Sequence, residues 1–137
     1  MNIKDIMETM DYGPAPEAST DVGAWLESRG RVFGHFIDGS FTGAGNASIE
    51  VENPATGEVI ARIPEGTEAE VNAAVAAAKE AFPAWSRLPG FERARYLYAI
   101  ARHLQQRERF FSVLESIDNG KPIKETRNAD IPLAIRH

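Results

Sequence analysis

A β-hairpin is predicted by the stretch Ser48-Ile-Glu-Val-Glu-Asn-Pro-Ala-Thr-Gly-Glu-Val-Ile-Ala-Arg-Ile63. In its first strand, Ile49 and Val51 alternate with glutamates, so one face should be buried and the other solvated. Between the strands, Pro54 fixes φ and Gly57 supplies backbone freedom, as is typical of turns. We therefore expect strands at residues 48–52 and 58–63, joined by the turn 53–57.

A second, shorter hairpin is expected just upstream. Phe33-Gly-His-Phe-Ile37 leads into Asp38-Gly39, and both turn positions tolerate the positive φ of a two-residue connection. Residues 40–42 would form the returning strand.

The first 32 residues are expected to form a leader that ends in a short helix. Residues 1–20 are polar and rich in turn formers, which is typical of an arm or a loosely held extension. Thr20 or Asp21 can then cap a helix that contains Trp25, and Gly30 is placed to end it.

Three amphipathic helices are expected between residues 67 and 120. Thr67 and Glu70 form a capping box at the start of the first helix, and Pro83 should end or kink that helix near Phe82. The second helix should run from about residue 91 to 106, and the third should close at Asn119-Gly120. The apolar residues at helical spacing are Val71, Ala74, Val75, Ala78, Ala81 and Phe82 in the first helix; Ala94, Leu97, Ile100, Ala101 and Leu104, expected on the buried side, in the second; and Phe110, Val113, Leu114 and Ile117 in the third.

One more helix is expected at the end of the chain. Asp130 can cap it, and Pro132 falls in its first turn, where proline is tolerated. Only residues 131–137 follow, and an isolated helix of that length is not stable without a packing partner. We therefore expect the chain to stop within an element.

Composition excludes several classes of protein. The formal net charge of −5 argues against a nucleic-acid partner, because phosphate binding needs clustered positive charge. The absence of cysteine excludes a disulfide scaffold and a thiolate zinc site. No apolar run approaches the roughly 18 residues that span a bilayer, and acidic residues occupy the start of the chain, where a signal peptide would be basic and apolar. We expect a cytoplasmic protein with neither a nucleic-acid nor a membrane partner.

Few side chains show a pattern with chemical meaning. His35, His103 and His137 are not at metal-ligand spacing. Asp118 differs, because it lies in the last turn of a predicted helix, where a carboxylate opposes the helix dipole. An aspartate facing solvent is the plainer interpretation, and a ligand or a partner for a cation is the alternative.

The order of the motifs resembles the start of the NAD(P)-dependent aldehyde dehydrogenases. The motifs that carry the resemblance are Phe36-Ile-Asp-Gly39, Asn53-Pro-Ala-Thr-Gly-Glu58, the stretch from Val71 to Trp85, the stretch from Arg95 to Leu104, and Asp118-Asn-Gly-Lys-Pro122. Together they extend from about residue 34 to residue 137. The leader Met10-Asp-Tyr-Gly-Pro-Ala-Pro16, with the helix around Trp25, resembles aldehyde dehydrogenase family 16, whose members carry a second, non-catalytic dehydrogenase-like domain.

The resemblance implies a chemistry that this chain cannot perform by itself. Family members oxidise an aldehyde to a carboxylic acid: a cysteine thiolate attacks the carbonyl, hydride passes to NAD(P)+, and a glutamate activates water. In the family these residues and the nucleotide-binding strands follow the segment matched here. No catalytic or cofactor-binding residue is therefore expected in this chain. NAD or NADP, the aldehyde and a homo-oligomeric assembly are expected only for the complete enzyme.

One binding site is implied within the chain. The family has a monovalent cation site formed by main-chain oxygens just before the Asn-Pro turn and by the aspartate of the Asp-Asn-Gly motif. By resemblance these ligands would be Val51, Glu52 and Asp118, which would explain an aspartate that opposes its helix dipole.

The expected fold class is α+β, with antiparallel hairpins plus three or four amphipathic helices, as the N-terminal part of an α/β aldehyde dehydrogenase fold. We expect a leader with a short helix over residues 1–32 and the start of an incomplete catalytic domain over residues 33–137. Two functions remain open: a structural portion of an aldehyde dehydrogenase, or a truncated, non-catalytic helical interaction module. An unrelated helix-and-hairpin domain would not explain the ordered motifs.

Overall fold

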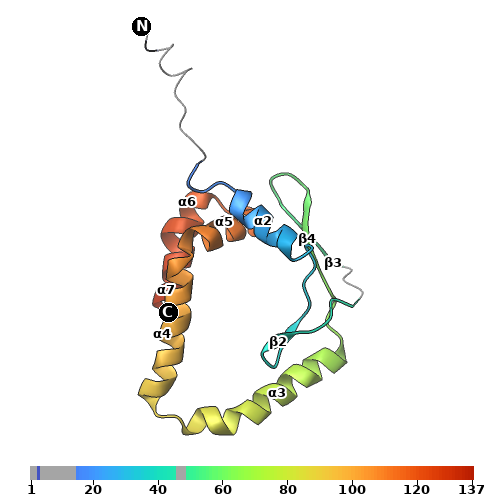
Figure 1. Ribbon diagram of the computed structural model, residues 1–137, viewed down its shortest axis with the longest axis vertical. Coiled ribbons are helices and arrows are strands. Elements are labelled where there is room, and N and C mark those ends of the chain that lie inside the picture. The colour runs from blue at the N-terminus through green and yellow to red at the C-terminus, as the bar shows by residue number, and fades with distance from the viewer. Residues whose placement is uncertain (1–2, 4–14, 46–48) are drawn as a thin grey trace.

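The computed structural model describes residues 15–45 and 49–137, together with Ile3. Expectations for most of the leader motif and for Ser48 lie outside the described residues. The helices are α2 (Thr20–Ser28), α3 (Glu68–Arg87), α4 (Gly90–Gln106), α5 (Glu108–Asn119), α6 (Ile123–Glu125) and α7 (Ile131–Arg136), with a π-helical turn η1 (Thr126–Asp130) between the last two; the strands are β1 (Phe36–Ile37), β2 (Ser40–Phe41), β3 (Ile49–Glu52) and β4 (Val59–Ile63). Figure 1 shows these elements arranged around a ring, with α3 and α4 as its two long arms.

Both predicted hairpins are present, which confirms the α+β class. Strand β1 pairs antiparallel with β2, and β3 pairs antiparallel with β4. In the first hairpin, Asp38 and Gly39 have φ of 51° and 73°, the left-handed values that this turn requires. Strand β4 is also paired on its other side, because Phe33 donates its amide to the Arg62 carbonyl at 3.0 Å. The segment before β1 therefore lies along the second hairpin.

The core is small and lies between α2 and α5. Val22, Leu26 and Val113 are each at most 5% exposed. The Trp25 ring lies 5.5 Å from both the Phe33 and the Phe110 rings, stacked on the first and edge-on to the second. Helix α2 therefore packs on the same core as the elements after residue 33, while the domain boundary at residue 32 stays a prediction.

The N-cap of helix α2 is Ser19 rather than Thr20 or Asp21, so those two cap assignments are wrong.

Helix α3 begins as predicted but does not end where expected. The Thr67 amide donates to the Glu70 carboxylate at 2.8 Å, and the capping box is present. An end near Phe82 is wrong, because the helix continues through Pro83 to Arg87, while the alternative of a kink there stays a prediction. Proline removes one helical hydrogen bond, and here Lys79, four residues before it, is exposed. The carbonyl left without a donor can therefore bond to water, which lowers the cost of keeping the proline.

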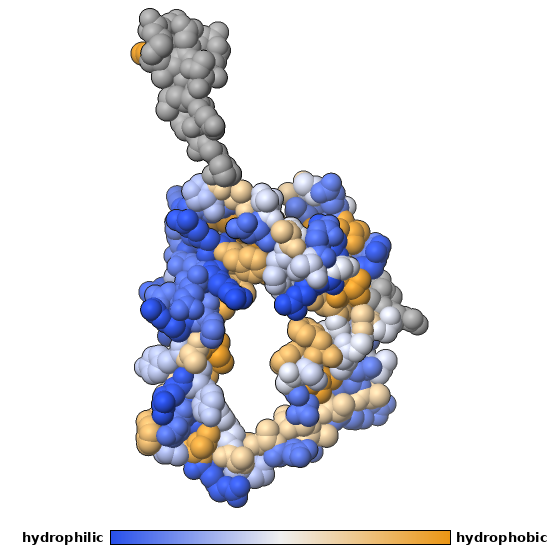
Figure 2. Space-filling model, in the orientation of Figure 1, coloured by the Kyte–Doolittle hydropathy of each residue, from blue (hydrophilic) through white to orange (hydrophobic). Residues whose placement is uncertain are grey.

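The apolar stripe of α4 is not buried, contrary to expectation. Leu97 and Ile100 are 62% and 58% exposed, and α4 contains no fully buried residue. The spacing predicted the helix correctly, but burial also needs a facing layer. Within the described residues α4 packs mainly against α7 and contacts α5 where the chain reverses. Figure 2 shows an opening through the middle of the molecule, between the arms.

The last helix, α7, begins after Asp130 with Pro132 in its first turn, as predicted, but it is not a separate helix. Residues 123–136 are helical without a break, and Asp130 has helical dihedral angles and no capping hydrogen bond. Its carboxylate lies 2.5 Å from the Lys121 ammonium, so its buried oxygen is compensated by charge. Thr126 is fully buried, and its hydroxyl donates to the Ser112 carbonyl at 3.0 Å. Packing on α5 therefore stabilises a segment that would be too short alone.

Candidate functional site

Two turns that are distant in sequence meet in the structure. Gly120, which follows α5 with φ of 76°, lies so close to the Asn-Pro turn that a Cβ placed on it would be 3.1 Å from Pro54 Cβ. The Asn53 side chain stabilises its own turn by accepting a hydrogen bond from the Ala55 amide at 3.0 Å. The Asn119 side chain stabilises the turn after α5 by accepting a hydrogen bond from the Lys121 amide at 2.8 Å. The Asn53-Pro54 turn and the Asn119-Gly120 turn therefore lie in contact, and we call this region the corner.

A cavity of about 560 Å³ opens against the core, lined mainly by residues of α2, the β3–β4 hairpin and α5. Val51 from β3 and Asp118 from α5 both line it, so the structure brings together two of the three expected cation ligands. Glu52 follows Val51 in the chain but is not part of the lining. Most of the walls are apolar: Trp25, Leu26, Phe33, Ile60, Ala61, Ile63, Phe111, Leu114 and Ile131. Over the described residues, no three histidine or carboxylate side chains gather as a metal cluster.

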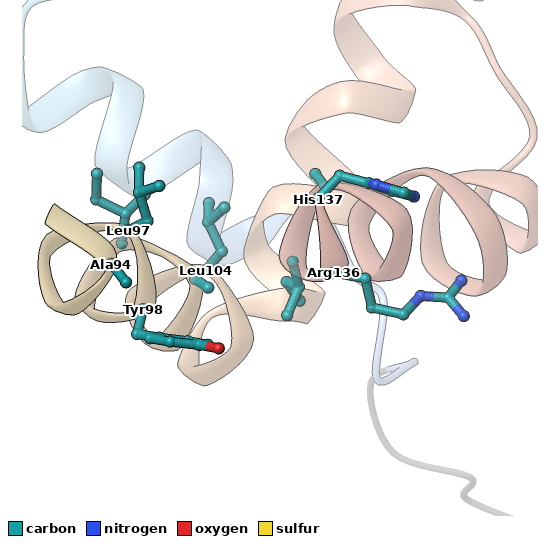
Figure 3. Close-up of a pocket in the computed structure, with 10 residues that line it drawn as sticks. Ala94, Leu97, Tyr98, Leu104, Arg136 and His137 are labelled. Carbon is teal, nitrogen blue, oxygen red and sulfur yellow. The ribbon is translucent and has the colours of Figure 1, made fainter. Parts of the chain in front are cut away.

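A second cavity, of about 330 Å³, lies between α4 and α7 (Figure 3). Leu97 and Leu104 line it from α4, and Arg136 and His137 line it from the end of the chain, with their side chains extending away from α4 in Figure 3. Tyr98 adds a hydroxyl at its edge. Arg136 donates to the Pro132 carbonyl of its own helix at 3.3 Å. This hollow offers mainly apolar contact, and its lining contains no aspartate or glutamate that could act as a base.

Three ionisable side chains have pKa values that are shifted mainly by hydrogen bonds within the fold. Hydrogen bonding to the Arg127 guanidinium, 2.6 Å away, lowers the pKa of Glu17. Hydrogen bonds from the Thr67 hydroxyl and amide lower the pKa of Glu70. The Asp130 carboxylate raises the pKa of Lys121. The Glu17–Arg127 pair joins segments 110 residues apart, and sequence patterns offered no signal for it because the partners share no element.

Two features that the resemblance implies for the complete enzyme can be compared with this chain. The chain has no cysteine, so it has no thiolate nucleophile. The two sheets are separate antiparallel hairpins, and within the described residues there is no parallel sheet that could bind a dinucleotide. Among the described residues the geometry thus offers a corner, a core and open cavities that include the two described above.

The model of the Aldehyde dehydrogenase family matches residues 41–137. This chain belongs to the aldehyde dehydrogenase family. Since the match begins at residue 41, the leader lies outside it. None of the helices in residues 15–45 and 49–137 is long and apolar enough to cross a membrane.

Solved structures support the family assignment and show how much of each relative this chain covers. PnpE, solved in complex with nicotinamide adenine dinucleotide, is 40% identical over 74% of this chain, with a TM-score of 0.67. Gamma-glutamyl-gamma-aminobutyraldehyde dehydrogenase from Burkholderia cenocepacia J2315 is 34% identical over 85%, with a TM-score of 0.72. HpcC from Thermus thermophilus is 32% identical over 93%, with a TM-score of 0.78. The chain spans 21%, 24% and 25% of the lengths of these three proteins.

Proposed function

We propose that this chain is the N-terminal portion of an aldehyde dehydrogenase of family 16. The complete enzyme would oxidise an aldehyde to a carboxylic acid with NAD+ or NADP+, as a cytoplasmic homo-oligomer. The observation that carries the proposal is the family match over residues 41–137 in a chain that spans about a quarter or less of its solved relatives. The role of this portion is structural.

The exposed apolar surface supports a structural role. Val71, Val75 and Phe82 on α3 are 58%, 47% and 65% exposed, in addition to Leu97 and Ile100 on α4. A soluble monomer rarely exposes an apolar surface this extensive unless another surface covers it. Hydrophobic residues lie along parts of the rim of the central opening (Figure 2). In the proposed enzyme, the nucleotide-binding domain covers these faces, and the ring packs around its outside.

The cofactor and the substrate belong to the complete enzyme. PnpE, a relative at 40% identity, was solved with nicotinamide adenine dinucleotide. This chain lacks the cysteine nucleophile, so we expect it to be inactive and to bind neither NAD+ nor NADP+ alone. Titration calorimetry with each dinucleotide checks this expectation, and clear binding by the 137-residue chain would contradict the structural role.

The proposed assignment to family 16 is based on the leader, residues 1–32. Met10-Asp-Tyr-Gly-Pro-Ala-Pro16 and the helix around Trp25 are the features that resemble family 16. In the structure Trp25 packs on Phe33 and Phe110, so that helix is part of the core. The intact mass of the natural protein, measured from its source, tests the proposal. A mass far above 15.0 kDa supports an enzyme portion, and a mass of 15.0 kDa favours the interaction module.

A monovalent cation is proposed at the corner, held by the main-chain oxygens of Val51 and Glu52 and by Asp118. Two observations support the site: Val51 and Asp118 line one cavity, and Pro54 packs against Gly120. A cation there would also offset the Asp118 charge at the end of the α5 dipole. Crystals soaked in rubidium or thallium salts test the site by anomalous scattering, and a map without a peak near Asp118 counts against it.

The alternative function is a free-standing interaction module. The core shared by α2, α5 and the end of the chain favours it, because Val22, Val113 and Thr126 are buried within this chain alone. A module should unfold cooperatively as a monomer. A molten or aggregated state would instead favour the enzyme portion, whose α3 and α4 need a covering domain.

A further inference from the structure

The contact between the first hairpin and helix α3 contains an unusual polar atom. His35, next to β1, is partly buried, and its Nε2 atom is inaccessible to solvent and has no hydrogen-bond partner among the described residues. A buried donor or acceptor without a partner costs about 1–3 kcal/mol. Such an atom points to a partner that is acquired under other conditions.

The surroundings of His35 supply one charged candidate. A hollow of about 390 Å³ lies between the hairpin and the start of α3, lined by His35, Phe36, Ile37, Gly66, Glu70, Val71 and Ala74. Glu70 is the one charged residue of that lining. Asp38 in the hairpin turn and Glu65 before Gly66 do not line the hollow.

Glu70 is held in a way that leaves it able to bind a second donor. Its Oε2 atom accepts hydrogen bonds from both the amide and the hydroxyl of Thr67. Its Oε1 atom accepts none from the part of the chain that the structure describes. The Thr67 hydrogen bonds lower the pKa of Glu70, and the charge of His35 acts in the same direction. Glu70 therefore stays ionised under mildly acidic conditions, in which an imidazole gains a proton.

We propose that His35 and Glu70 form a pH-sensitive latch between the β1–β2 hairpin and the first turn of α3. Protonated, the imidazole Nε2 is a donor, and the Glu70 carboxylate that caps α3 is the acceptor across the hollow. Unprotonated, the imidazole carries no charge, and the latch adds nothing to the contact of β1 with α3. The latch is closed where the imidazole is protonated and Glu70 is ionised, and it opens again where Glu70 itself takes up a proton.

The latch can be followed with spin labels, because the chain has no native cysteine. Labels on the exposed positions Ser40→Cys in the hairpin and Lys79→Cys on α3 report the hairpin–helix distance by pulsed electron resonance. From about pH 8 to about pH 5.5, we expect the docked fraction, relative to the undocked fraction, to rise about twofold to fivefold, the range of a partly exposed ion pair.

Three variants separate the latch from general effects of pH. His35→Gln removes the titrating group, and Glu70→Gln removes the charge while keeping a residue that a capping box accepts. Both should abolish the pH dependence. His103→Gln, on the exposed side of α4, should leave it unchanged. A wild-type distance distribution that is equal at both pH values, or a shift that persists in His35→Gln, overturns the latch. If the hairpin never docks on α3, the distance distributions are equal at both pH values, and the latch is overturned.

Discussion

Replacement of Gly120 by alanine should destabilise the chain more than the same replacement at Gly57. Both glycines have left-handed φ, 76° and 72°, so both alanines carry the same backbone penalty. They differ in their surroundings: a Cβ at Gly57 meets nothing within 4 Å, whereas at Gly120 it meets Pro54 Cβ at 3.1 Å and Cγ at 3.2 Å. The difference in stability between the two alanine variants therefore measures the cost of crowding between Gly120 and Pro54.

The size of each effect follows from its cause. A non-glycine residue in the left-handed region costs roughly 1–2 kcal/mol, which is the whole expectation for Gly57→Ala. At Gly120 the proline ring must also move by a few tenths of an ångström, and it is part of a tight turn rather than the end of a flexible side chain. Overpacking of this kind adds about 1–3 kcal/mol. Gly120→Ala should then cost about 2–5 kcal/mol, the sum of these two ranges.

Denaturant unfolding of the two variants, followed by Trp25 and Trp85 fluorescence, measures the difference. Adding Pro54→Ala to Gly120→Ala should recover part of the loss, because it removes the Cγ contact at 3.2 Å and the ring constraint while keeping the Cβ. Equal stability losses at Gly57 and Gly120 would refute the packing of the two turns.

Three further outcomes are expected. Thr126→Val should cost about 1–2 kcal/mol, since the buried hydroxyl that donates to the Ser112 carbonyl is lost, whereas Thr126→Ser should keep that bond in the same unfolding assay. The pKa of Glu17 is lowered by Arg127, so the ion pair should contribute above the ordinary value of 4.5 and be lost as pH falls below it; amide exchange should show residues 15–19 loosening in acid, and Glu17→Gln should remove that dependence. Leu97→Gln should change the free energy of unfolding by less than about 0.5 kcal/mol, because Leu97 is 62% exposed, and a large loss would show that α4 is covered within the isolated chain.

Local chemistry accounts for the elements that sequence patterns predicted. The capping box at Thr67 and Glu70, the positive φ of Asp38 and Gly39, and the left-handed Gly120 at the end of α5 involve groups only a few residues apart. The geometry of such groups follows from backbone sterics and short hydrogen bonds, whatever surrounds them. The ordered sequence motifs also resembled the family, and the match over residues 41–137 confirms it.

Tertiary contacts decided which faces are buried and which groups meet. The stripe of α4 has the same spacing as a buried helix, yet Leu97 and Ile100 are exposed, because burial depends on a layer that helical spacing cannot specify. Pro83 remains inside α3 because its surroundings are open to water, and Asp130 lies within a helix because packing on α5 extends that helix past it. The contact of Pro54 with Gly120 and the hollow shared by His35 and Glu70 are likewise long-range, since each joins elements that a linear pattern treats separately.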